Sequence, residues 1–142
     1  ITITGFRGGE SPENPDAYHE GTHRKVRDVM FNRRAQAYWG LRERFWKTYQ
    51  AADGEYVDPD ALIFLDPEHP LISQLRSEIC RIPLKHHAGG KIQIMPKAEM
   101  KKPPLSLPSP DLADAMAYAF SVQDFIHGAW SAPLEYKESA YI

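Results

Sequence analysis

An alanine-rich segment that opens with Ser-Pro, residues 109–126, constrains the fold of this chain more than any other stretch. Ser109 is a favourable helix N-cap, and Pro110 suits the first position of a helix. Nearly every side chain over residues 112–122 is apolar or small, whichever side of the helix it faces. A helix that is apolar all round is normally buried, so the pattern predicts a buried helix that ends near Gly128.

Two acidic residues, Asp111 and Asp114, interrupt this segment at a spacing that places both on one face of the helix. Carboxylates that lie close together on a buried helix repel each other and lose hydration, unless a cation compensates them. Carboxylate oxygens are ligands that Mg²⁺ prefers, so the pair predicts a metal site. The helix dipole alone would explain an acid in the first turn, such as Asp111, but it explains Asp114 poorly.

The rest of the chain reads as parts of one domain over residues 1–142. Alternating β-branched and polar residues predict a strand over 1–6, and a segment rich in Gly, Pro and charge predicts a mobile loop over 7–28. Residues 61–65 form a short apolar run, which fits either a buried strand or a helical turn. Apolar stretches on both sides of Ala-Gly-Gly predict a β-hairpin over 82–95.

Helical periodicity marks two further segments. Asn32 can cap a helix that runs to about Ala52, because apolar residues recur in it at spacings of three and four. A second helix follows, with a predicted buried face of Ile72, Leu75 and Ile79. The basic, proline-rich residues 97–108 are typical of a linker.

The net charge of -2 means that contacts with nucleic acid would have to come from local basic patches. Such patches give five candidate phosphate contacts, although a charge run is more often just a solvated face: Arg33, Arg34, Lys97, Lys101 and Lys102. The single cysteine, Cys80, fits a reducing compartment and is expected to be buried as a small apolar residue. No stretch of the sequence is long and apolar enough to span a membrane.

The string His19-Glu20-Gly21-Thr22-His23 matches a zinc-protease motif. The motif functions only on a helix, where both histidines reach one Zn²⁺ and the glutamate acts as base. The internal glycine and the absence of an apolar stripe favour a polar loop here.

Residues 109–115 read Ser-Pro-Asp-Leu-Ala-Asp-Ala, and this block resembles a motif near the end of the nuclease domain of bacteriophage large terminase subunits. Residues 32–39, Asn-Arg-Arg-Ala-Gln-Ala-Tyr-Trp, resemble a second block, and the basic stretch at 97–102 fits the family's layout. The Asp-x-x-Asp-Ala pattern is also similar to Holliday-junction resolvases of the RNase H superfamily. The blocks occur in the family's order over roughly residues 1–126, which is more specific than any one of them.

The resemblance implies an incomplete α/β domain of RNase H-like type, with a mixed sheet and flanking helices. It implies a Mg²⁺- or Mn²⁺-dependent endonuclease that cuts double-stranded DNA by a two-metal mechanism during genome packaging. Asp111 and Asp114 would be catalytic residues and metal ligands, and further acids from before Ile1 would complete the site.

The resemblance also implies partners and a location. The partners would be double-stranded DNA, the terminase small subunit and the portal protein, and the location would be the host cytoplasm, without a membrane. The alternative is a non-catalytic module that binds DNA or the portal, in which the two aspartates only cap and solvate a helix.

Overall fold

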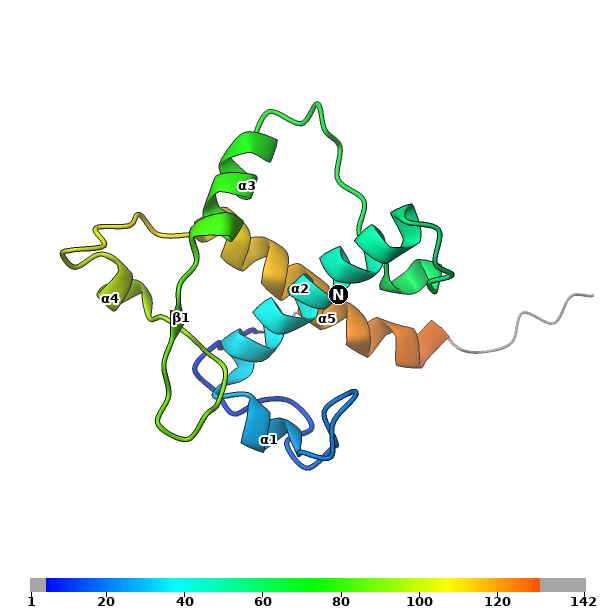
Figure 1. The fold of residues 1–142 in the computed structure, drawn as a ribbon, viewed down its shortest axis with the longest axis horizontal. Helices are drawn as coiled ribbons and strands as arrows, with labels where there is room; N and C mark the ends of the chain where they lie inside the picture. Colours follow the sequence, from blue (N-terminus) through cyan, green and yellow to red (C-terminus); the bar gives the residue numbers. More distant parts are fainter. Residues whose placement is uncertain (1–4, 131–142) are drawn as a thin grey trace, which may run out of the picture.

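The structure is a computed structural model that describes residues 5–130 of the chain, with side chains described as far as Ser121. The predicted strand at 1–6 falls mostly outside the described residues. Two long helices, α2 (Arg33–Ala52) and α5 (Asp111–Trp130), cross at the middle of the molecule, and the other elements lie around them (Figure 1).

Helix α2 begins where the sequence predicts, because the Asn32 side chain accepts a hydrogen bond of 2.9 Å from the amide of Ala35. Its apolar stripe is buried only in the first half of the helix. Tyr38 and Leu41 lie in the core, whereas the side chain of Tyr49 is 62% exposed. The first half of α2 therefore forms the central contact with α5.

Small residues of α5 allow it to pack closely on α2. Ala113 and Ala117 are fully buried in the core cluster, together with Ala35 and Leu41 of α2. The helix continues to Trp130, so the predicted end near Gly128 is wrong. A glycine inside a helix costs only about 1 kcal/mol relative to alanine, which does not by itself stop a helix.

The remaining elements are short. They are helix α1 (Val26–Val29), the 3₁₀ helix η1 (Pro59–Ala61), helix α3 (Ile72–Arg81), strands β1 (Leu84–Lys85) and β2 (Gln93–Ile94), and helix α4 (Lys97–Met100). Helix α4 lies in the segment predicted to be a linker. No strand forms at 61–65, where Phe64 is 81% exposed, and Cys80 is exposed rather than buried.

The fold is a mixture of helix and strand in which helices dominate. Strands β1 and β2 pair antiparallel, with Leu84 opposite Ile94 and Lys85 opposite Gln93. Over residues 5–130 this two-stranded ladder is the only sheet, so the predicted larger mixed sheet is not seen there. No helix in the described part of the chain is long and apolar enough to cross a membrane.

Candidate functional site

Asp114 is a buried acid at the crossing of α2 and α5. Its side chain is only 6% exposed, and its Oδ1 atom accepts hydrogen bonds from two residues of α2. The Tyr38 hydroxyl donates at 2.5 Å, and the Arg34 guanidinium donates through Nη2 at 3.0 Å and Nε at 3.2 Å. Arg34 is held in turn by a 2.9 Å hydrogen bond to the carbonyl oxygen of Met95. Asp114 is thus a fixed, ionised group in the interior.

Lys97 joins Asp114 to the second acid of the predicted pair. Its ammonium nitrogen lies 2.8 Å from Oδ2 of Asp114 and 2.8 Å from Oδ1 of Asp111. The Asp111 side chain is 74% exposed and also accepts a 2.6 Å hydrogen bond from the hydroxyl of Ser109. One cation therefore bridges both carboxylates at the start of α5, and the two acids share a face as predicted.

These contacts shift the pKa values of both acids downward. Burial would raise the pKa of Asp114, but the hydrogen bonds from Lys97 and Tyr38 and the charge of Arg34 outweigh it and lower the pKa. Hydrogen bonds from Lys97 and Ser109 lower the pKa of Asp111. Hydrogen bonds to the two acids raise the pKa of Lys97, so all three groups are charged at neutral pH.

Burial, together with the hydrogen bond to Asp114, raises the pKa of Tyr38. The phenol therefore stays protonated and remains a hydrogen-bond donor to the carboxylate. A permanently neutral donor next to a buried anion is well suited to keep that anion in one orientation.

An open cleft of about 620 Å³ runs past the two acids. Lys97, Asp111, Asp114 and Tyr118 line one part of it, and the backbone around Gly8 lines another. Gly8 accepts a 2.9 Å hydrogen bond from the amide of Arg34 through its carbonyl oxygen. A Cβ atom at position 8 would lie only 3.0 Å from Cβ of Arg34, so any larger residue there would force the Arg34 side chain or the loop to shift.

The predicted phosphate contacts fall into two groups. Arg33 and Arg34 are largely buried and form ion pairs, Arg33 with Glu10 and Glu13 and Arg34 with Asp114. Lys101 and Lys102 are exposed and come directly after α4, which begins at Lys97. Contact with DNA remains a prediction for all five residues.

The predicted N-cap of the last helix is not the group that binds its first amides. The Ser109 hydroxyl donates to Asp111, and the amides of Leu112 and Ala113 are bound by the carboxylate of Glu78 from α3. Sequence reasoning missed Glu78. Its position on the same face of α3 as Leu75 was the available signal, because an acid on an apolar stripe is unusual.

The zinc-protease string is not helical. Residues 19–23 form a turn with Gly21 at φ 71°, between the paired residues Tyr18 and Lys25. The turn agrees with the polar loop favoured by the sequence. Within the part of the chain that the structure describes, no group of three or more His, Cys, Asp or Glu side chains could hold a metal ion.

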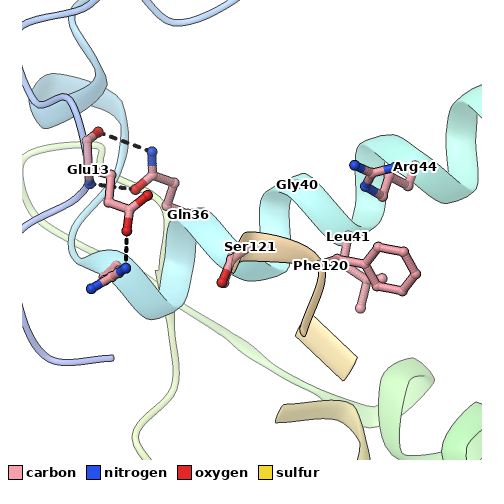
Figure 2. A pocket seen from close by; sticks show the side chains of 9 residues that line it. Glu13, Gln36, Gly40, Leu41, Arg44, Phe120 and Ser121 are labelled. Atoms are coloured by element: carbon pink, nitrogen blue, oxygen red, sulfur yellow. Dashed lines mark hydrogen bonds and ion pairs between the residues drawn. The ribbon is translucent and has the colours of Figure 1, made fainter. Parts of the chain in front are cut away.

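A second hollow lies between α2 and the middle of α5, and neither of the two acids lines it (Figure 2). It has a volume of only about 70 Å³. Figure 2 shows Gln36 at one end of the hollow, where its side chain exchanges hydrogen bonds of 2.7 and 3.2 Å with the backbone of Glu13. The hollow is small, and the hydrogen bonds between Gln36 and Glu13 attach the loop around Glu13 to α2.

No protein-family model matches the sequence, and no curated protein matches it either. Solved structures do match it. One is the nuclease domain of the large terminase subunit gp2 of bacterial virus Sf6, at 40% identity and a TM-score of 0.74. A K428A mutant of that domain with manganese and beta-thujaplicinol matches at 39% identity and the same TM-score. The K428A mutant gp2c with calcium matches at 38% identity and a TM-score of 0.71.

Each of these matches covers 80% of this chain and 50% of the solved chain. The chain therefore spans about half the length of the structures that it matches. The predicted resemblance is confirmed: in sequence and in structure, this chain is similar to the nuclease domain of a bacteriophage large terminase subunit.

Proposed function

We propose that this chain is part of a metal-dependent endonuclease domain that hydrolyses double-stranded DNA during phage genome packaging. The support is the 40% identity to a terminase nuclease domain, together with the paired acids at the start of α5. In this proposal the fold is of RNase H-like type, and Asp111 and Asp114 are its catalytic metal ligands. Bound Mg²⁺ or Mn²⁺ ions would supply an activated water and stabilise the leaving oxygen.

The observation that carries the proposal is the position of the Lys97 ammonium group. It lies 2.8 Å from one oxygen of each acid, at a cleft that is open to solvent. Two carboxylates that converge on one cation form a site for positive charge, and oxygen ligands of this kind suit Mg²⁺ and Mn²⁺. A divalent ion bound there would have to displace the ammonium group or share the acids with it.

The residues of this chain would have separate tasks at such a site. Arg34 and Tyr38 bind Oδ1 of Asp114, which leaves Oδ2 directed toward the position that Lys97 occupies. They would orient the Asp114 carboxylate without occupying Oδ2, the oxygen that faces Lys97. Two acids are too few for a two-metal site, so we propose that the rest of the nuclease domain supplies further acidic ligands.

The DNA would lie along the cleft, and the exposed Lys101 and Lys102, which follow the cleft residue Lys97 in the chain, would contact its phosphates. Such contacts recognise the backbone and not the base sequence. Arg33 and Arg34 serve this proposal less directly, because their charges are already neutralised by acids. The terminase small subunit and the portal protein are the proposed partners, and the host cytoplasm is the proposed location.

The test is a calorimetric titration of Mn²⁺ into the full-length protein and its variants. We expect Asp111→Asn and Asp114→Asn each to weaken Mn²⁺ binding at least tenfold and to abolish cleavage of a linear duplex. Lys97→Ala removes the competing cation and should strengthen Mn²⁺ binding. Equal Mn²⁺ affinity in the wild type and both aspartate variants would overturn the proposal.

The second candidate is a non-catalytic module that binds DNA or the portal. The exposure of Asp111 favours it, because an exposed acid in a first helical turn is explained by the helix dipole alone. This function predicts that both aspartate variants retain DNA binding and that Mn²⁺ changes neither binding nor the DNA product. Gel analysis of duplex DNA after incubation with Mn²⁺ distinguishes the two functions.

A further inference from the structure

Glu78 is a buried acid outside the cleft. It lies on α3, and its residue exposure of 6% is close to the 4% of Asp114. These two are the only buried acidic residues in the part of the chain whose side chains the structure describes. A buried carboxylate costs free energy unless it is fully hydrogen-bonded, so its partners indicate why it is there.

Both oxygens of Glu78 are used. Oε2 accepts hydrogen bonds from the amides of Leu112 at 2.8 Å and Ala113 at 3.1 Å, and Oε1 accepts one of 2.9 Å from the side chain of Gln74. The first amides of a helix have no partner within the helix, and they carry the positive end of its dipole. Glu78 therefore performs for α5 the role that an N-cap side chain normally performs, although it comes from another helix.

The two capped amides lie between the acids of the candidate metal site. Asp111 precedes Leu112, and Asp114 follows Ala113, so one hydrogen-bonded turn carries both carboxylates. The hydroxyl of Ser109, the N-cap that the sequence predicts, donates to Asp111 instead. The first amides of this turn are therefore bound by a side chain more than 30 residues away in the sequence.

We propose that Glu78 is a positioning residue that fixes the first turn of α5, so that Asp111 and Asp114 converge on one cation. The inference rests on the proposed function for the role of the two acids as metal ligands. The contact of Glu78 with the amides of Leu112 and Ala113 does not depend on that function. Glu78 touches no substrate. It acts through the backbone of Leu112 and Ala113, and Gln74 fixes the orientation of its carboxylate.

The test uses three variants of the full-length protein. Glu78→Ala removes both acceptors, whereas Glu78→Gln has the same shape and retains one carbonyl oxygen for the two amides. Glu68→Gln is the matched control, because Glu68 is exposed in the loop before α3. Three properties are measured for each variant. They are the rate of amide hydrogen exchange at Leu112 and Ala113, the NMR signals of the carboxyl carbons of Asp111 and Asp114, and the affinity for Mn²⁺.

We expect Glu78→Ala to speed exchange at both amides at least tenfold, to shift both carboxyl signals and to weaken Mn²⁺ binding about tenfold. Glu78→Gln should restore most of each property, and Glu68→Gln should match the wild type. Faster exchange with unchanged carboxyl signals and unchanged Mn²⁺ affinity would overturn the inference, since Glu78 would then only stabilise the fold.

Two further outcomes are decisive. If Glu78→Ala does not fold, the comparison of Glu78→Gln with Gln74→Ala decides the question, because each removes only part of the network. If the wild type binds no Mn²⁺, the proposed function fails, while the carboxyl signals still show whether Glu78 positions the two acids. Unchanged carboxyl signals in every folded Glu78 variant contradict the inference in either case.

Discussion

The inner and outer sides of the first turn of α5 carry the same chemical group in opposite surroundings. On the inner side, the 6%-exposed carboxylate of Asp114 meets Tyr38, Arg34 and Lys97. On the outer side, the 74%-exposed carboxylate of Asp111 contacts Lys97 and the hydroxyl of Ser109. A buried charge is tolerated only with its partners in place, whereas an exposed pair adds little to stability. Asp114 should therefore matter to the fold as well as to the site, and Asp111 to the site alone.

The largest expected effect belongs to Asp114→Asn. The variant preserves the shape of the side chain but leaves the buried guanidinium of Arg34 without its counter-charge. Breaking a buried ion pair by removing one partner costs roughly 3–5 kcal/mol, so the free energy of unfolding should fall by an amount of that order. Urea denaturation followed by circular dichroism measures the change. A loss below about 1 kcal/mol would show that the ion pair of Asp114 contributes no more to stability than a solvent-exposed pair does.

Tyr38→Phe should have the next largest effect. It removes one hydrogen bond to the Asp114 carboxylate and leaves Arg34 in place. A hydrogen bond to a charged group contributes about 1.5–3 kcal/mol, which sets the expected loss in the free energy of unfolding. Tyr49→Phe is the control, because Tyr49 lies on the same helix but is exposed. Equal losses in the two variants would contradict a specific role for the buried phenol.

As the pH falls, protonation of Asp114 should weaken its contacts with Arg34 and Lys97 before the packing of α2 on α5 is affected. The folded-state pKa of Asp114 lies below its ordinary value of 3.8, so its contribution to stability is present above that value. It is lost as the pH falls through the lowered pKa, because protonation removes the charge that holds Arg34 and Lys97. Melting temperatures from pH 6 to about 2.5 measure this loss. The melting temperature of Asp114→Asn should change less with pH than that of the wild type. If the two curves are parallel, Asp114 is not the group whose protonation destabilises the fold.

The smallest effect on stability is expected for Asp111→Asn. The side chain is mostly exposed, so its ion pair with Lys97 is screened by solvent and the melting temperature should not change measurably. The same variant should still weaken Mn²⁺ binding, if the proposed function holds. A clear drop in melting temperature would remove the contrast between the two sides of the turn.

The sequence predicted the local features well. Asn32 caps α2 as expected, and the spacing of Asp111 and Asp114 placed them on one face. Both features are set by residues only a few positions apart. The type of residue at the start of a helix predicts its N-cap, and the helical repeat predicts which residues share a face.

The partners of the buried acids were not predictable in the same way. Tyr38 is 76 residues from Asp114 in the sequence, and Arg34 is 80 residues from it. Arg34 was placed among the candidates for phosphate contact, because nothing in the neighbouring sequence indicates that a basic residue on a helix has a buried acidic partner. The exposure of Phe64 was missed for a related reason, since apolar runs predict burial only where another element covers them.

The tight approach of Gly8 has a consequence for which sequences this cleft tolerates. A methyl group at position 8 would press on Cβ of Arg34 and the hydroxyl oxygen of Tyr118, at 3.0 and 3.4 Å. At neighbouring Gly9, nothing lies within 4 Å of an added Cβ atom. Random mutagenesis of this glycine pair should thus tolerate alanine freely at the second position and select against it at the first, although the two residues look interchangeable in the sequence.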